Sequence, residues 1–110
     1  MDDIERRRFP RRTLVCKITA IFGERLLMLS SHTENVGIGG IRVILQEKLH
    51  ISTEVEIELF LEDREKPLKS KGQIIWVREL NPEKIQPRFF DTGIKFIGMN
   101  SSDQELLRRR

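Results

Sequence analysis

Apolar and polar residues alternate with a period of two along much of this chain, which is the pattern of β-strands that have one buried face and one exposed face. The clearest stretch is 54–62, in which apolar side chains share one face and glutamates share the other. Its apolar face consists of Val55, Ile57, Leu59 and Leu61. Phe60 falls on the glutamate face, where it is either an isolated surface residue or part of a contact surface.

Further stretches of the same kind predict five more strands, and turn-forming residues separate them. These strands are expected at 13–22, 26–34, 40–45, 70–79 and 88–97. No helical crossover separates them, so the strands should form an antiparallel sheet that closes or folds over to hide its edges. The pattern therefore predicts an all-β fold, a six-stranded antiparallel small β-barrel.

The end of the chain has a different pattern, typical of a short C-terminal α-helix. Ser101 or Ser102 can cap it, acidic residues occupy its first turn and basic residues its end. We expect this helix to close one end of the barrel with Leu106 and Leu107.

A length of 110 residues corresponds to one domain. The formal net charge is +3, but residues 1–12 hold five arginines against three acids, and residues 108–110 add three arginines. Residues 13–107 carry 12 basic and 14 acidic side chains. We therefore expect a flexible basic N-terminal arm at 1–12 and a barrel with its helix at 13–110. Basic ends on a nearly neutral body favour a local anion site over a surface that coats nucleic acid.

The remaining composition excludes several classes of function. Cys16 is the single cysteine, so no internal disulfide can form, and the absence of a secretory signal or a long apolar run indicates a cytoplasmic protein without membrane insertion. His32 and His50 have no partners at metal-ligand spacing. Ser30, Ser31 and His32 are neighbours, which a strand points to opposite faces, and no nucleophile turn or phosphate-binding loop is present. We expect a protein that is not an enzyme and holds no metal.

Two motifs carry most of the functional information: a basic arm at 5–12 and a glycine-dense turn at 35–40. Arginine presents planar forks that can bind phosphate or a guanine edge through two hydrogen bonds. Pro10 biases Phe9 towards extended backbone, so the arm is not expected to be helical. Taken alone, the arm reads as a solvated basic tail and the turn as a hairpin bend that requires positive φ.

Together the motifs resemble the signature of the PilZ domain family, which is R-x-x-x-R followed by [D/N]-x-S-x-x-G. This chain has Arg7-x-x-x-Arg11 and Asn35-x-Gly37-x-x-Gly40. The resemblance implies a receptor for cyclic di-GMP, a ligand with two phosphates and two guanine bases, which requires no further cofactor.

The resemblance also implies roles for the arm. Arg7 and Arg11 would bind phosphate and the Hoogsteen edge of guanine. Arg8 begins the same spacing one residue later, so Phe9 and Pro10 decide the register. Arg6 precedes the first motif arginine, as in family members that take up a stacked pair of ligands.

Three residues of the later part of the signature would complete the site. The resemblance implies that Asn35 contacts a guanine edge and that Gly40 permits a sharp turn. Position 37 should offer a hydroxyl, which Gly37 lacks; one lost neutral hydrogen bond costs about 0.5–1.5 kcal/mol, or up to about tenfold in affinity.

The stretches 72–77 and 91–96 also resemble later PilZ strands, so the resemblance covers nearly the whole chain. Trp76, in the first of them, has two interpretations. It is either a core residue or a stacking platform at the edge of the ligand.

Three hypotheses about function follow. The first is a cyclic di-GMP receptor that changes its surface on binding and so regulates an effector protein, and intact Arg7 and Arg11 favour it. The second is a PilZ-like adaptor between proteins that has lost nucleotide binding, which Gly37 favours. The third is a small barrel that binds RNA or DNA, which the near-neutral body and the lack of tyrosine disfavour.

Overall fold

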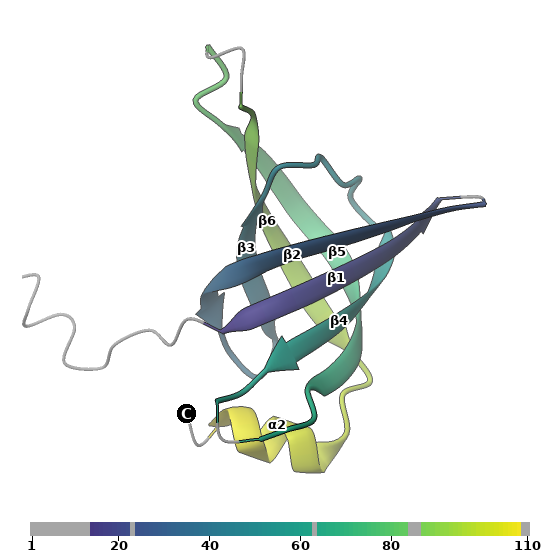
Figure 1. The fold of residues 1–110 in the computed structure, drawn as a ribbon, viewed down its shortest axis with the longest axis vertical. Coiled ribbons are helices and arrows are strands. Elements are labelled where there is room, and N and C mark those ends of the chain that lie inside the picture. The colour runs from purple at the N-terminus through teal and green to yellow at the C-terminus, as the bar shows by residue number, and fades with distance from the viewer. Residues whose placement is uncertain (1–13, 23, 63, 84–86, 109–110) are drawn as a thin grey trace, which may run out of the picture.

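The computed structural model describes residues 14–22, 24–62, 64–83 and 87–108, which form a closed barrel of six antiparallel strands (Figure 1). The strands are β1 (Val15–Phe22), β2 (Arg25–Val36), β3 (Gly40–Leu45), β4 (Glu54–Phe60), β5 (Leu68–Leu80) and β6 (Phe89–Ile97). Around the barrel their order is β1-β2-β3-β6-β5-β4. The predicted all-β barrel is confirmed.

The core lies inside the barrel and is built from alternate residues of the strands. In β4 the predicted apolar face is buried, whereas Glu54 and Glu56 are exposed. Phe60 is exposed on the glutamate side, as its position in the sequence indicates. The period-two pattern therefore assigns the two faces of this strand correctly.

Two strands are longer than the sequence pattern predicts. β2 continues through Val36, and β5 starts at Leu68 and ends at Leu80. Each contains an irregularity: the β2–β3 register shifts between Thr33 and Asn35, and the β5–β6 register shifts between Ile74 and Trp76. Such bulges interrupt the alternation of faces, so sequence periodicity alone does not locate these strand ends.

The predicted C-terminal helix is α2 (Ser101–Arg108), and it lies across one end of the barrel (Figure 1). Leu107 is buried in the core and Leu106 packs against it, as expected. The predicted cap is wrong. The side-chain oxygen Oδ1 of Asn100 accepts a hydrogen bond of 2.8 Å from the backbone N–H of Asp103, so Asn100 is the cap and Ser101 is the first residue of the helix.

Cys16 is a free thiol inside the barrel, and burial raises its pKa to about 11. It is therefore protonated and unreactive in the folded protein near neutral pH. Among the described residues, no helix combines the length and the apolar character needed to cross a membrane.

The cap assignment yields a test of stability. Asn100→Ala should lower the free energy of unfolding by about 1 kcal/mol, because the first turn of α2 loses its side-chain acceptor. Ser101→Ala is the matched control and should change stability by less than about 0.5 kcal/mol. Urea unfolding of the three proteins measures both effects, and a larger effect at Ser101 would contradict the assignment.

Candidate functional site

A cavity of about 420 Å³ lies on the outside of the barrel, where the turn between β2 and β3 meets β5 and β6. It is lined by Asn35, Gly37, Gly39, Gly40, Ile41, Arg42, Ile75, Trp76, Gly93, Ile94 and Lys95. Four of the predicted site residues, Asn35, Gly37, Gly40 and Trp76, are therefore brought together although Trp76 is far from the others in sequence. We call this cavity the turn pocket.

The turn is held by its own backbone and by β6. The N–H of Gly37 donates to the carbonyl of Gly40 at 3.0 Å, and the N–H of Phe96 donates to the carbonyl of Gly39 at 2.9 Å. Gly40 must be glycine because a Cβ atom there would overlap the carbonyl oxygen of Ile94 on β6. These contacts fix the turn against the neighbouring strand.

The turn does not have the positive φ that a simple hairpin bend would require. Gly98 is the one described glycine with φ in the left-handed region. Gly37 has an ordinary φ, and a Cβ atom built on it would have no neighbour within 4 Å. A serine side chain could therefore be accommodated at position 37 without strain.

Trp76 forms one wall of the turn pocket. The bulge in β5 leaves both Ile75 and Trp76 on the surface, with Trp76 38% exposed. Trp76 pairs with Gly93 of β6, and a Cβ atom on Gly93 would overlap the indole ring. The indole thus packs over the backbone of β6 on the outer face of the barrel, and the interpretation of Trp76 as a core residue is wrong.

A buried carboxylate beside the pocket was missed by the sequence analysis. The Asp91 side chain is 1% exposed and accepts hydrogen bonds from Nε and Nη2 of Arg42 at 2.8 and 3.0 Å. Arg78 Nη2 donates to the same carboxylate at 3.0 Å. These bonds, those from Arg42 first, lower the pKa of Asp91 despite its burial. One carboxylate therefore fixes the guanidinium of Arg42, which lines the pocket.

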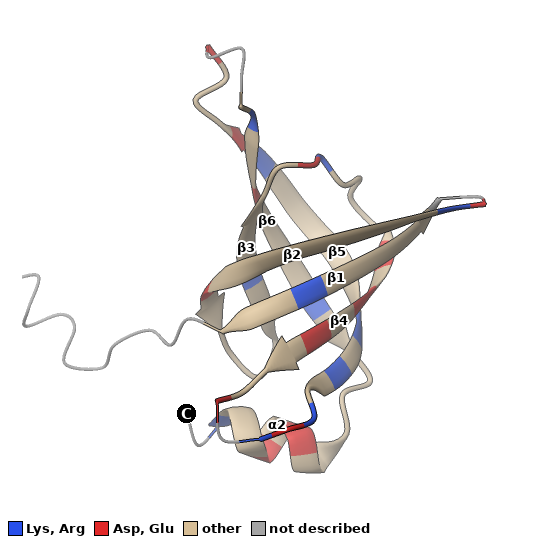
Figure 2. Cartoon of the chain, in the orientation of Figure 1, with Lys and Arg blue, Asp and Glu red and all other residues tan. Residues whose placement is uncertain are grey.

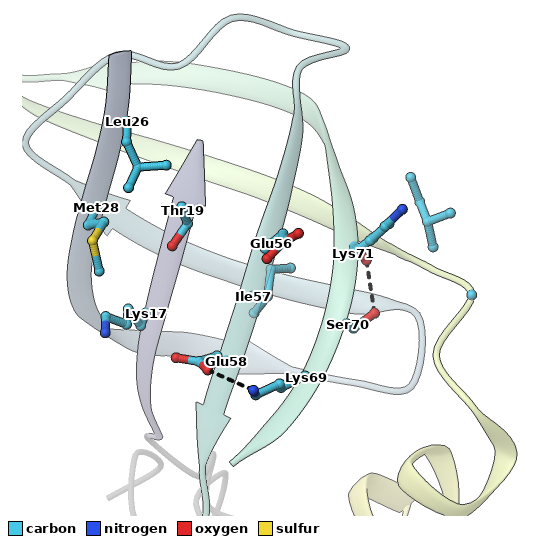
Figure 3. A pocket seen from close by; sticks show the side chains of 12 residues that line it. Lys17, Thr19, Leu26, Met28, Glu56, Ile57, Glu58, Lys69, Ser70 and Lys71 are labelled. Atoms are coloured by element: carbon cyan, nitrogen blue, oxygen red, sulfur yellow. Dashed lines mark hydrogen bonds and ion pairs between the residues drawn. The ribbon is translucent and has the colours of Figure 1, made fainter. Parts of the chain in front are cut away.

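The charge of the turn pocket favours an anion. Its lining includes two basic residues, Arg42 and Lys95, and no acidic residue, although the charge of Arg42 is balanced by Asp91 beside the pocket. A larger cavity of about 780 Å³ lies over β1, β2, β4 and β5 (Figure 3). Lysines and glutamates are interspersed there (Figure 2), so despite its size it presents no uniform charge to a phosphate.

The predicted arm residues Arg6, Arg7, Arg8 and Arg11 lie outside the described residues, so their positions relative to the pocket are not assigned. The first described residue after the arm is Leu14. Its N–H donates to Oγ1 of Thr33 at 2.9 Å, and the N–H of Thr33 donates back to the Leu14 carbonyl at 2.8 Å. Thr33 is two residues before Asn35, so the chain enters the barrel next to the pocket.

The described residues contain no group of three His, Cys, Asp or Glu side chains arranged to hold a metal ion. The candidate ligand groups of the site are therefore amide, backbone, aromatic and cationic groups.

The small closed barrel, its terminal helix and the glycine-dense turn define one class of domain. The model of the PilZ domain family matches residues 5–110, and the chain belongs to that family. Among solved structures, the chain is similar to the PilZ domain with c-di-GMP of YcgR from Escherichia coli, with a TM-score of 0.60 and 14% sequence identity. The match covers 93% of this chain and 79% of that chain, and at this identity it shows the fold alone. A comparison with curated proteins gives no match.

The Asp91 network predicts a pH-dependent effect on stability. Asp91→Asn should lower the free energy of unfolding at pH 7 by about 2 kcal/mol, because three charge-assisted hydrogen bonds lose their anion. The folded-state pKa of Asp91 is depressed, so its contribution is complete above the unfolded-state value of about 3.9 and is lost as the pH falls through the lower folded-state value.

Urea unfolding of both proteins from neutral to acidic pH measures this effect. The difference in stability between wild type and Asp91→Asn should shrink below about pH 4, where the Asp91 carboxylate of the unfolded wild-type protein takes up a proton before that of the folded protein does. A gap of constant size across this range would show that the charge of Asp91 is not what stabilises the network.

Proposed function

We propose that this protein is a cyclic di-GMP receptor that binds its ligand in the turn pocket and acts as a non-enzymatic adaptor in the bacterial cytoplasm. The observation that carries this proposal is the meeting of Asn35, Gly37, Gly40 and Trp76 at one cavity. Membership of the PilZ family supports it, as does the presence of c-di-GMP in the similar PilZ domain of YcgR.

The chemistry of the pocket suits a guanine nucleotide. The Asn35 side chain can bind a base edge, because an amide offers both a donor and an acceptor. The exposed indole of Trp76 offers a flat surface on which a base can stack. Lys95 adds positive charge for the phosphates, and Arg42 is a second cation at the pocket although its charge is balanced by Asp91.

The basic arm would complete the site. Arg7 and Arg11 bind phosphate and the guanine Hoogsteen edge, and Arg6 and Arg8 add charge around them. Ordering of the arm over the pocket would change the surface beside Leu14, where the arm joins β1. An effector protein that contacts this surface would then sense the ligand.

The second candidate is a PilZ-like adaptor that no longer binds the nucleotide. One observation favours it: the open space around Gly37 contains no hydroxyl where the family signature has serine. The loss of one neutral hydrogen bond weakens binding by up to about tenfold, which reduces affinity without abolishing it. The receptor is therefore preferred.

Isothermal titration calorimetry with cyclic di-GMP distinguishes the two candidates. The receptor should bind with micromolar or better affinity, and Arg7→Ala or Arg11→Ala should largely abolish binding, because each removes a charge-assisted pair of hydrogen bonds. Arg64→Ala, in the exposed β4–β5 loop, is the matched control and should bind as wild type does. If the wild-type protein gives no binding heat and no chemical-shift change at high ligand concentration, the adaptor without nucleotide binding is correct.

The lack of a side chain at position 37 gives a second test. Gly37→Ser should tighten binding by about 0.5–1.5 kcal/mol, and the thermal midpoint should not fall, because the backbone there accepts a side chain. Gly39→Ser is the control, since position 39 is equally open but is not the serine position of the signature. Equal affinities of Gly37→Ser and wild type would show that position 37 makes no side-chain contact with the ligand.

A further inference from the structure

Among the described residues, β2 pairs with a strand on only one side over much of its length. β2 pairs with β1 over the whole of Arg25–His32, but within the described residues it pairs with β3 only from Thr33 onwards. The β1–β2 hairpin consequently extends beyond the rest of the barrel (Figure 1). Within the described residues, Arg25–Ser30 of β2 have a second edge with no strand paired to it; at Ser31 the side-chain hydroxyl already donates to the carbonyl of Ile44 on β3 at 3.0 Å.

The hydrogen bond between Leu14 and Thr33 identifies the backbone groups on this edge. The N–H of Thr33 donates to the carbonyl of Leu14, so Thr33 points its backbone groups towards β1. Backbone direction alternates along an antiparallel strand. The N–H and C=O groups of Leu26, Met28 and Ser30 therefore point away from β1, towards the unpaired edge.

The side chains of this segment are unusual for an unprotected edge. Leu26 and Met28 are 60% and 51% exposed on the outer face, where they border the larger cavity (Figure 3). Leu27 and Leu29 face inwards but are only partly buried. Residues 26–31 contain no charge and no proline, the usual means by which edge strands avoid pairing with other chains.

We propose that this edge is an interface on which a second copy of the chain adds its own β2, antiparallel, to form a symmetric dimer with a continuous sheet. The register is centred on Met28, because Leu26, Met28 and Ser30 then all take part. Met28 lies opposite Met28 of the second copy, and Leu26 lies opposite Ser30. Leu27 then faces Leu29 on the inner side.

The occupant is a second copy because the segment is complementary to itself. A two-fold axis brings the same donors and acceptors together in the antiparallel sense that a ladder requires. In this register Met28 meets Met28 and Leu27 meets Leu29, so apolar side chains meet in these pairs, while Leu26 lies opposite Ser30. The exposed carboxylate of Glu24 lies opposite the imidazole of His32, and Arg25 lies opposite Ser31, so no like charges meet. The pairing involves no residue that lines the turn pocket and does not depend on cyclic di-GMP.

Analytical ultracentrifugation of the full chain over a wide concentration range tests the proposal. Wild type should pass reversibly from a 13.0 kDa monomer to a species of twice that mass. Met28→Pro should weaken association at least tenfold, because proline removes an N–H that points to the free edge and leaves the β1–β2 ladder intact. A wild-type protein that stays monomeric, as it would if the edge served a foreign peptide, overturns the proposal. Unchanged association of a folded Met28→Pro overturns it equally.

A cross-linking experiment tests the register and does not require the proline variant to fold. Met28→Cys should cross-link to itself with a short bis-maleimide, since opposite residues of a ladder have Cα atoms about 5.5 Å apart or less. The native Cys16 is fully buried and should not react. Ile51→Cys, which is 60% exposed in the β3–β4 loop, is the control; it keeps the β2 edge and should still associate, but it should not be cross-linked. Failure of Met28→Cys to cross-link above the level of Ile51→Cys would contradict the proposed interface.

Discussion

The close packing of β6 against its two neighbours is the constraint on which the candidate site depends. On one side, Gly40 of β3 leaves room for the carbonyl of Ile94; on the other, Gly93 leaves room for the indole of Trp76. A Cβ atom at either glycine would push a wall of the turn pocket outwards. The pocket is thus shaped by two glycines at the start of β3 and beside the β5 bulge, neither of which has a positive φ.

The buried carboxylate of Asp91 holds two arginine side chains in place beside this wall of the pocket. Removal of a charge from water is costly unless the charge is paired, and Asp91 is paired with two guanidinium groups from two other strands. These two ion pairs link β3, β5 and β6 and hold Arg42 at the pocket. The rigid half of the proposed site is therefore built into the barrel, and the arm would supply the half that responds to the ligand.

Much of the fold could be predicted from the sequence, because a strand with one face exposed to solvent alternates apolar and polar residues. Val55, Ile57 and Leu59, all buried, show this alternation in β4. Asn35, Gly37 and Gly40 were identified as a group because they are neighbours in a recognisable motif. The bulge that turns Trp76 outwards breaks the period and was not predictable from it.

Three further features could not be predicted from the sequence, for related physical reasons: the cap of α2, the Arg42–Asp91 pair and the unpaired edge of β2. Asn100, Ser101 and Ser102 are all good caps, and the choice among them depends on where α2 starts when Leu107 packs into the barrel. The Arg42–Asp91 pair joins residues 49 positions apart, so only the β3–β6 register reveals it. The unpaired edge of β2 likewise depends on where pairing with β3 begins.

The central claim is that the turn pocket is where cyclic di-GMP binds, and amide chemical-shift mapping during a ligand titration tests it most directly. The account predicts that the largest changes fall on the turn from Asn35 to Gly40, on the indole N–H of Trp76 and on the arm arginines. Changes that cluster instead around Lys17 and Lys71, which line the larger cavity, or no changes at all, would contradict it.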